Sequence, residues 1–100
     1  MKRVSIFGAT GSVGQSTLDL IGRGDYDVVA LTGGHNVALL AADAIRLRAD
    51  VAVTAYDDQL FTLREALAGT GIEAAAGTAA LEEAADRPAD WIMSAIVGVA

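Results

Sequence analysis

The sequence predicts an α/β fold in which a doubly wound parallel sheet lies between two layers of helices, a three-layer α/β/α arrangement. Short apolar runs alternate along the chain with segments whose apolar residues recur at helical spacing. The runs are apolar at successive positions, as expected for strands that are buried on both faces. A glycine-rich segment also separates the first run from the first helical segment. Right-handed connections then predict the strand order 3-2-1-4-5.

The first strand and the first helix are indicated at the start of the chain. Residues 4–7 form a short apolar run that ends at Gly8. From Gly11 onward the apolar residues follow helical rather than alternating spacing. Glycine occurs twice within residues 22–24, where we expect this helix to end.

The second strand and helix follow directly. Residues 26–31 predict a strand buried on both faces, which Gly33 and Gly34 end. Asn36 suits the N-cap of the next helix, because its side-chain oxygen can accept a hydrogen bond from a free backbone amide. Apolar residues at helical spacing extend this helix over residues 37–47.

The second half of the chain predicts three further strands and two helices. Asp57 or Asp58 is expected to cap the first of these helices, and Thr78 the second. Trp91 and Met93 are expected in the core. The expected strands are residues 51–53, 72–76 and 91–93, and the expected helices extend as far as residue 67 and over residues 78–86.

The composition is that of one domain, residues 1–100, and it excludes several classes of protein. The net charge is −6 and the basic residues are scattered, so we expect no nucleic-acid partner. The absence of cysteine excludes disulfides, zinc–thiolate sites and thiol nucleophiles. No apolar run reaches the roughly 18 residues that span a bilayer, so we expect a soluble, cytoplasmic chain without a membrane partner. Residues 96–100 are apolar with no following helix to cover them, so we expect the chain to be part of a longer protein.

The glycine-rich segment is the strongest functional signal, with the pattern G-x-x-G-x-x-G from Gly8 to Gly14. A strand precedes it and a helix follows it, which is the context of a dinucleotide-binding turn in a Rossmann-like fold. Gly8 lets the backbone leave the strand sharply, Gly11 lets a pyrophosphate approach without meeting a Cβ atom, and Gly14 lets the helix pack close to the sheet.

The free backbone amides at the start of this helix are the expected ligands of the pyrophosphate. The amides of Gly11, Ser12 and Val13 lie at the positive end of the helix dipole. The hydroxyl groups of Thr10 and Ser12 add further donors. Fixed local dipoles of this kind let a chain of net charge −6 bind an anionic cofactor without a basic surface.

The end of the second strand predicts which dinucleotide binds. NAD-binding sites usually place an Asp or Glu about 20 residues beyond the glycine pattern, but residues 32–36 contain no carboxylate. A carboxylate there would repel a 2′-phosphate by about 4 kcal/mol at roughly 4 Å and an effective dielectric near 20. Its absence favours NADP(H), with Gly34, His35 and Asn36 placed to donate to that phosphate. The alternative is a simple helix cap beside a solvent-exposed histidine.

The remaining polar residues predict no catalytic or metal site. The acidic residues Asp57, Asp58, Glu82, Glu83 and Asp86 are interpreted as helix-terminal or solvated charges, and none is spaced for a metal ion. Ser16, Thr17 and Ser94 have no histidine or lysine nearby that would activate a nucleophile. We therefore assign no catalytic residue and no metal ligand in this chain.

Two segments resemble one enzyme family. Residues 4–19, VSIFGATGSVGQSTLD, closely resemble the opening of 1-deoxy-D-xylulose 5-phosphate reductoisomerases, in which G-x-T-G-S-I-G-x-S-T-L-D is a signature. Residues 93–98, MSAIVG, resemble the A-I-V-G segment of that family. Two such segments in the right order are more specific than the glycine pattern alone.

The resemblance covers essentially the whole chain, but only the N-terminal NADPH-binding part of enzymes that are several times longer. The cofactor-binding residues that it implies are Thr10, Gly11, Ser12, Val13, Gly34, His35, Asn36 and Ala95. The first four would hold the pyrophosphate and the next three the adenosine 2′-phosphate. Ala95, with Ile96, would line the approach to the nicotinamide ribose. The chain departs from the common pattern with His35 where many members carry Lys or Arg, and Gly33 where Ala is frequent.

The resemblance also implies an activity for the complete enzyme. Such enzymes rearrange the phosphosugar 1-deoxy-D-xylulose 5-phosphate on Mg²⁺ or Mn²⁺ and reduce the product with NADPH to 2-C-methyl-D-erythritol 4-phosphate, an early step of non-mevalonate isoprenoid synthesis. The metal and substrate residues would lie in a missing C-terminal portion, so residues 1–100 alone would be inactive. The complete enzyme would be a homodimer.

Two alternatives remain open at this point. One is another NADP-dependent dehydrogenase with a G-A-T-G opening, of the semialdehyde dehydrogenase or N-acetyl-γ-glutamyl-phosphate reductase type. The other is a nucleotide-binding module without catalysis. The continuation S-T-L-D at residues 16–19 favours the reductoisomerase over the other dehydrogenases.

Overall fold

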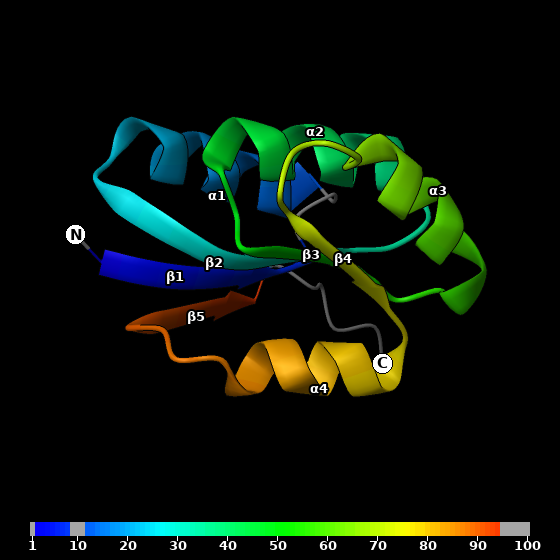
Figure 1. Cartoon of the computed structure of the whole chain (residues 1–100). Coiled ribbons are helices and arrows are strands. Elements are labelled where there is room, and N and C mark those ends of the chain that lie inside the picture. The colour runs from blue at the N-terminus through cyan, green and yellow to red at the C-terminus, as the bar shows by residue number, and fades with distance from the viewer. Residues whose placement is uncertain (1, 9–11, 95–100) are drawn as a thin grey trace.

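The computed structural model describes residues 2–8 and 12–94, with the backbone alone for residues 12–14 (Figure 1). Strands and helices alternate along this part of the chain. The strands are β1 (Lys2–Phe7), β2 (Tyr26–Gly33), β3 (Val51–Thr54), β4 (Glu73–Ala76) and β5 (Trp91–Ser94). The helices are α1 (Ser12–Arg23), α2 (Val37–Leu47), α3 (Leu60–Ala66) and α4 (Thr78–Asp86), with a short 3-10 turn, η1 (Asp57–Gln59), before α3. Every predicted strand and helix is present, with small differences at the ends.

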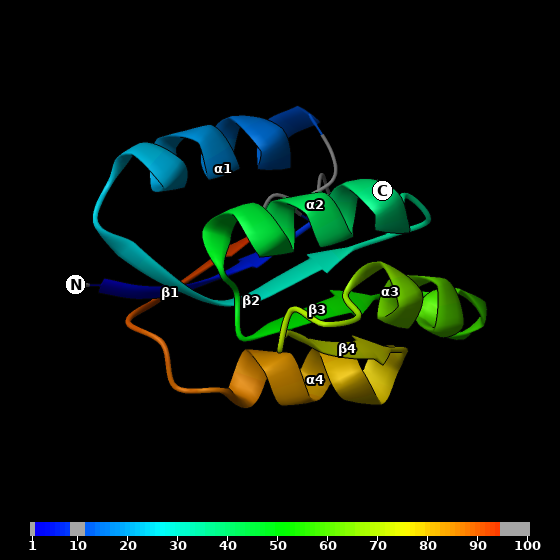
Figure 2. The ribbon, with the colours of Figure 1, turned by 45° about the horizontal axis from the view of Figure 1, so that its top comes forward.

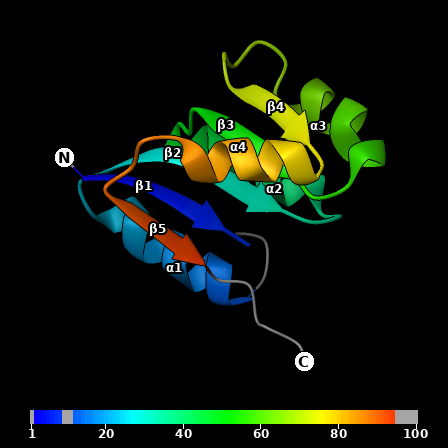
Figure 3. The same cartoon turned by 90° about the horizontal axis from the view of Figure 1, so that it is seen from below.

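The strands form one parallel sheet in the order β4-β3-β2-β1-β5. The parallel, doubly wound arrangement is confirmed, but the predicted order 3-2-1-4-5 is wrong. That order places the fourth strand beside the first, whereas β4 pairs with β3 at the edge of the sheet. Because α3 covers the same face as α1 and α2, the chain continues outward past β3. The connection through α4 then returns it to the far side of β1 (Figure 3).

The helices make the two outer layers of the predicted three-layer fold. Helices α1, α2 and α3 lie side by side on one face of the sheet, and α4 lies on the other (Figures 1 and 2). Within the described residues, no helix is long and apolar enough to cross a lipid bilayer.

Most of the core lies between the sheet and the three-helix layer. Val4, Ile6 and Leu31 of the strands pack there with Leu18 of α1 and Leu40 of α2, and all five side chains are fully buried. A smaller cluster faces α4, consisting of Ala30, Val51, Val53 and Ala84. Because both faces of the central strands are covered, their apolar residues occupy successive positions, as the sequence indicated.

The expectation that Trp91 lies in the core is wrong. Its side chain is 43% exposed, because β5 forms an edge of the sheet in the part of the chain that the structure describes. The indole ring lies tilted against Tyr26, with ring centroids 5.8 Å apart, and the Lys2 ammonium lies 5.2 Å from its centroid. Met93, the other expected core residue of β5, does pack against the main core.

The predicted helix caps are correct for one helix out of three. Asn36 caps α2, since its Oδ1 accepts a hydrogen bond from the Leu39 backbone amide at 3.2 Å. Thr78 is instead the first residue of α4, and Gly77 is its N-cap with φ of 90°. Asp57 lies within η1 and provides no side-chain cap, and its carboxylate lies against Gly77. The carboxylate occupies the space that any larger residue at the α4 cap would need.

Candidate functional site

The carboxyl ends of the parallel strands define the edge of the sheet where a ligand is expected. Ligands of open α/β sheets bind outside these ends, next to the strand at which the connections diverge. That strand is β1, because β2 lies on one side of it and β5 on the other. The loops that follow β1, β2 and β3 therefore form the candidate site.

The chain leaves β1 at Gly8, as the sequence predicts. Gly8 has φ of 80°, a left-handed conformation in which glycine avoids the steric cost of a Cβ atom. Its backbone N–H donates a hydrogen bond to Thr32 Oγ1 at 3.0 Å. Because Thr32 lies near the end of β2, this bond ties the start of the glycine-rich turn to the neighbouring strand. Sequence analysis missed this role for Thr32.

Several predicted ligands lie outside the described residues. These are Thr10, Gly11, Ala95 and Ile96, whose predicted contacts therefore remain predictions. Ser12 and Val13 are the first two residues of α1. The first amides of a helix have no acceptor within it, and the first turn of α1 contains no acidic residue to occupy them.

The predicted phosphate loop, residues 34–36, connects β2 to α2 and is fastened to β3. Thr54 is fully buried at the end of β3, and its hydroxyl donates to the Gly34 carbonyl oxygen at 2.9 Å. The Ala55 backbone N–H donates to the Gly33 carbonyl oxygen at 2.9 Å. Two hydrogen bonds therefore fix the path of this loop beside the loop that follows β3.

The predicted site residues Gly34, His35 and Asn36 are brought together at this corner of the sheet. The Asn36 Oδ1 atom is engaged by the α2 cap. The backbone amides of all three residues donate to no other described residue. The helix cap and the exposed histidine of the alternative interpretation are thus both present. Beside them lie backbone amides without an acceptor among residues 2–8 and 12–94.

The His35 ring stacks on Tyr56. Their ring centroids are 3.7 Å apart and their planes differ by 12°, and both side chains are exposed. Tyr56 belongs to the loop after β3, distant from His35 in the chain. The expected adjacency of the second and third strands placed these two loops side by side. Nothing in the sequence indicated that the side chains of His35 and Tyr56 would contact each other.

The buried carboxylate of Asp43 in α2 links this helix to α1. Asp43 is 4% exposed, and its Oδ2 accepts a hydrogen bond from Gln15 Nε2 at 2.7 Å. Its Oδ1 accepts from Arg46 Nη2 at 3.3 Å. Because Gln15 lies one turn from the start of α1, the contact holds the amino-terminal end of that helix against α2. Sequence analysis also missed this link.

The acidic residues that the sequence analysis interpreted as helix-terminal or solvated charges, Asp57, Asp58, Glu82, Glu83 and Asp86, are exposed. No group of potential metal ligands lies among the described residues. Glu83 and Glu73 bind the guanidinium of Arg87 at 2.7 and 3.0 Å. Burial lowers the pKa of Arg87, but the hydrogen bonds and negative charges of these two glutamates raise it by more, so it lies above its usual value.

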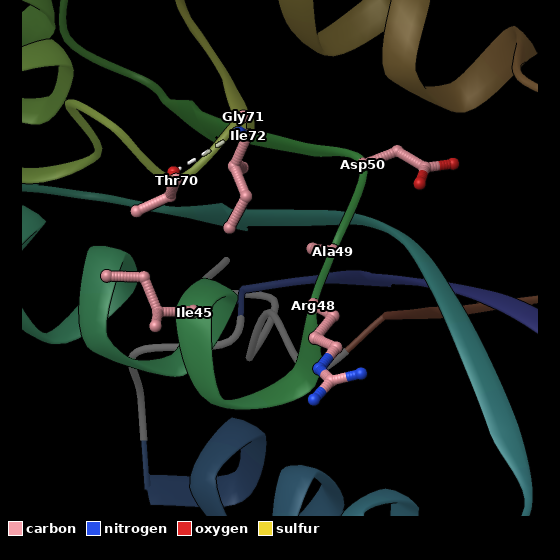
Figure 4. Close-up of a pocket in the computed structure, with 7 residues that line it drawn as sticks. All are labelled: Ile45, Arg48, Ala49, Asp50, Thr70, Gly71 and Ile72. Atoms are coloured by element: carbon pink, nitrogen blue, oxygen red, sulfur yellow. Dashed lines mark hydrogen bonds between the residues drawn. The ribbon is translucent and has the colours of Figure 1, made fainter.

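A pocket of about 510 Å³ lies at the opposite edge of the sheet, where α2 ends and β3 and β4 begin (Figure 4). Its lining residues are Ile45, Arg48, Ala49, Asp50, Thr70, Gly71 and Ile72. Asp50 is paired there with Arg3 at 2.9 Å. Because ligands of parallel sheets bind at the carboxyl ends of the strands, we do not place the functional site in this pocket.

Known relatives resemble the chain over its full length. A chain from Ruegeria sp. (strain TM1040) named 1-deoxy-D-xylulose 5-phosphate reductoisomerase is 72% identical over 102 residues, which cover 100% of this chain and 26% of the relative. One of the same name from Jannaschia sp. (strain CCS1) is 70% identical over 101 residues, covering 99% and 26%. The chain therefore spans about a quarter of the length of the relatives it matches.

Solved structures of these enzymes share the fold. The reductoisomerase from Zymomonas mobilis in complex with NADPH is 52% identical, with a TM-score of 0.94, over 97% of this chain and 26% of that one. A structure in complex with NADPH, fosmidomycin and magnesium is 32% identical, with a TM-score of 0.89, over 98% and 25%.

The sequence model of one family matches residues 4–100, and its description is 1-deoxy-D-xylulose 5-phosphate reductoisomerase. This match covers nearly the whole chain, including both segments on which the resemblance was based. It decides against the other dehydrogenase families with a G-A-T-G opening. The chain belongs to the 1-deoxy-D-xylulose 5-phosphate reductoisomerase family.

Proposed function

We propose that residues 1–100 form the NADPH-binding domain of a 1-deoxy-D-xylulose 5-phosphate reductoisomerase. The main supporting observation is the corner where Gly8 leaves β1 beside the carboxylate-free loop after β2. Relatives of the same family have been solved with NADPH bound, and they match this chain over nearly all of its length. The pyrophosphate and the adenosine 2′-phosphate of the cofactor are assigned to the amino termini of two different helices.

The pyrophosphate is assigned to the start of α1. The amides of Gly11, Ser12 and Val13 and the hydroxyl of Thr10 would donate to its oxygens. No acidic residue in the first turn of α1 competes with the anion for these donors. The link from Gln15 to Asp43 would keep this helix end in place when the cofactor binds.

The adenosine 2′-phosphate is assigned to Gly34, His35 and Asn36. The first turn of α2 also lacks acidic residues, so its positive end would attract the phosphate. Because the Asn36 Oδ1 atom is engaged by the cap, the Asn36 side chain would donate through its amide nitrogen. The backbone amides and the His35 imidazole would complete the set of donors.

NADPH, when bound, supplies the hydride for the reduction, and the protein orients it. We assign Ala95, with Ile96, to the approach of the nicotinamide ribose, at the carboxyl end of β5. The phosphosugar substrate, the Mg²⁺ or Mn²⁺ ion and the homodimer are assigned to the complete enzyme. We place no metal ligand in this chain.

Two variants test the cofactor assignment. Gly11→Val should abolish binding of both NADPH and NADH, because a branched side chain would occupy the space of the pyrophosphate. His35→Asp should weaken NADPH by about tenfold or more relative to NADH, because the introduced carboxylate repels the 2′-phosphate. Dissociation constants from calorimetric titration measure both effects, and circular dichroism checks that each variant is folded.

These variants are best measured in a complete enzyme. Residues 1–100 can replace the corresponding segment of the Ruegeria relative, which is 72% identical. This chimaera should turn over deoxyxylulose phosphate with NADPH and Mg²⁺, whereas the 100-residue chain alone should show no turnover. Undiminished NADPH binding in Gly11→Val, or equal losses of NADPH and NADH in His35→Asp, would contradict the assignment.

A further inference from the structure

The stack of Tyr56 on His35 lies at the loop assigned to the 2′-phosphate. The ring centroids are 3.7 Å apart and the planes are nearly parallel, at 12°. An exposed histidine otherwise samples several side-chain rotamers, and an anionic ligand would have to select one of them. The stack favours one orientation of the His35 ring before any ligand binds.

Tyr56 is itself held in place by the buried end of β3. The Thr54 hydroxyl oxygen accepts a hydrogen bond from the Tyr56 backbone N–H at 3.3 Å, and the same hydroxyl donates to the Gly34 carbonyl oxygen at 2.9 Å. The Tyr56 carbonyl oxygen also accepts from the Gln59 backbone N–H at 3.0 Å. One buried side chain, Thr54, therefore sets the loop of Tyr56 and the loop of His35 relative to each other.

The tyrosine ring lies close to the backbone of Gly34. A Cβ atom at Gly34 would lie 3.5 Å from Tyr56 Cε2, which is van der Waals contact. The phenol ring thus covers one face of His35 and approaches the backbone of the preceding residue. The edge of the imidazole, where its two nitrogen atoms lie, is the part of the ring that can donate to a phosphate oxygen.

We propose that Tyr56 is a positioning residue that orients His35 toward the adenosine 2′-phosphate, and that it thereby contributes to the selection of NADPH over NADH. This inference rests on the proposed function, because it requires the 2′-phosphate to bind at residues 34–36. NADH lacks that phosphate, so the loss of the stack affects its binding little. The energetic effect appears in the ratio of the two dissociation constants.

The test compares Tyr56→Ala, Tyr56→Phe and a matched control, Phe61→Ala, in the chimaeric enzyme. Phe61 is an aromatic residue of α3 that is 71% exposed. Tyr56→Ala should weaken NADPH binding by about two- to tenfold, the range of measured aromatic pairs, with NADH nearly unchanged. Tyr56→Phe keeps the ring and should retain the wild-type ratio. Phe61→Ala should change neither constant.

A double variant separates positioning from direct contact. If Tyr56 acts through His35, Tyr56→Ala should have no further effect on NADPH affinity in a His35→Ala background. An equal loss of NADPH and NADH in Tyr56→Ala, or a loss in Tyr56→Phe as large as in Tyr56→Ala, would overturn the inference. If the wild-type enzyme prefers NADPH through His35 but Tyr56→Ala leaves the ratio unchanged, the inference alone fails. If His35 variants do not alter the ratio either, the assignment of the 2′-phosphate fails with it.

Discussion

The backbone N–H of Gly8 donates a hydrogen bond to the hydroxyl oxygen of Thr32 at 3.0 Å. Thr32 is 3% exposed, whereas Gly8 is partly exposed, so this bond is part-buried between the ends of β1 and β2. It anchors the residue at which the chain turns out of the sheet toward α1. The glycine-rich turn thus begins from a residue that the neighbouring strand holds in place.

Replacement of Thr32 by valine should therefore destabilise the fold. Valine has a similar shape but no hydroxyl, so the Gly8 amide would lose its acceptor, at a cost of about 0.5 to 1.5 kcal/mol in the free energy of unfolding. Thr32→Ser keeps the hydroxyl and should cost less. Urea unfolding followed by circular dichroism measures both. Equal stability of the valine variant and the wild type would show that the bond contributes nothing.

Loss of the Asp43 carboxylate should loosen α1 from α2. Asp43→Ala removes the acceptor of Gln15 and Arg46, and we expect a loss of roughly 1.5 to 3 kcal/mol, typical of hydrogen bonds to a buried charged group. Asp43→Asn keeps one oxygen acceptor and should be milder. NADPH affinity should fall in the same order, because the amino end of α1 is assigned to the pyrophosphate. An alanine variant with wild-type stability and affinity would contradict this prediction.

Gly77→Ala should destabilise the chain more than Gly71→Ala. Both residues have positive φ, 90° and 79°, so both substitutions carry a backbone cost. Gly77 has ψ of 174°, an extended conformation at positive φ that is almost exclusive to glycine. At Gly77 the new Cβ atom would also collide with the Asp57 carboxylate, whereas nothing lies within 4 Å at Gly71.

Asp57→Ala in the Gly77→Ala background isolates the steric part of that effect. Removal of the carboxylate should recover the steric part of the loss in Gly77→Ala and leave the backbone cost at that residue. Thermal or urea unfolding of the wild type, of the two glycine variants and of the double variant measures these changes in stability. A loss of stability from Gly77→Ala that is the same with and without the Asp57 carboxylate would mean that this side chain moves aside at no cost.

The two ion pairs of Arg3 should contribute little stability. Arg3 binds Asp27 at 3.0 Å and Asp50 at 2.9 Å across the amino-terminal edge of the sheet, and the three side chains are 43% to 49% exposed. Exposed pairs typically contribute about 0.2 to 1 kcal/mol each and weaken as salt screens them. Arg3→Gln should therefore lower stability slightly at low salt and even less at 1 M salt. A loss of several kcal/mol would show that the pairs are effectively shielded from water.

Features set by near neighbours in the chain could be predicted from the sequence. The apolar spacing predicted each strand and helix, and Gly8 and Asn36 were correctly assigned to a sharp turn and a helix cap. These follow from the local periodicity of side chains and from conformations that one residue prefers. The motifs at both ends of the chain likewise indicated the family that the comparisons then showed.

The tertiary structure alone decided which segments meet. The neighbour of β4, the exposure of Trp91 and the failure of Thr78 to cap α4 depend on how α3 and α4 cross the sheet and on the space that Asp57 occupies. The contacts of Gln15 with Asp43 and of His35 with Tyr56 join residues more than 20 positions apart. No local pattern encodes such pairs, because they form only when packing of the whole core brings separate loops and helices together.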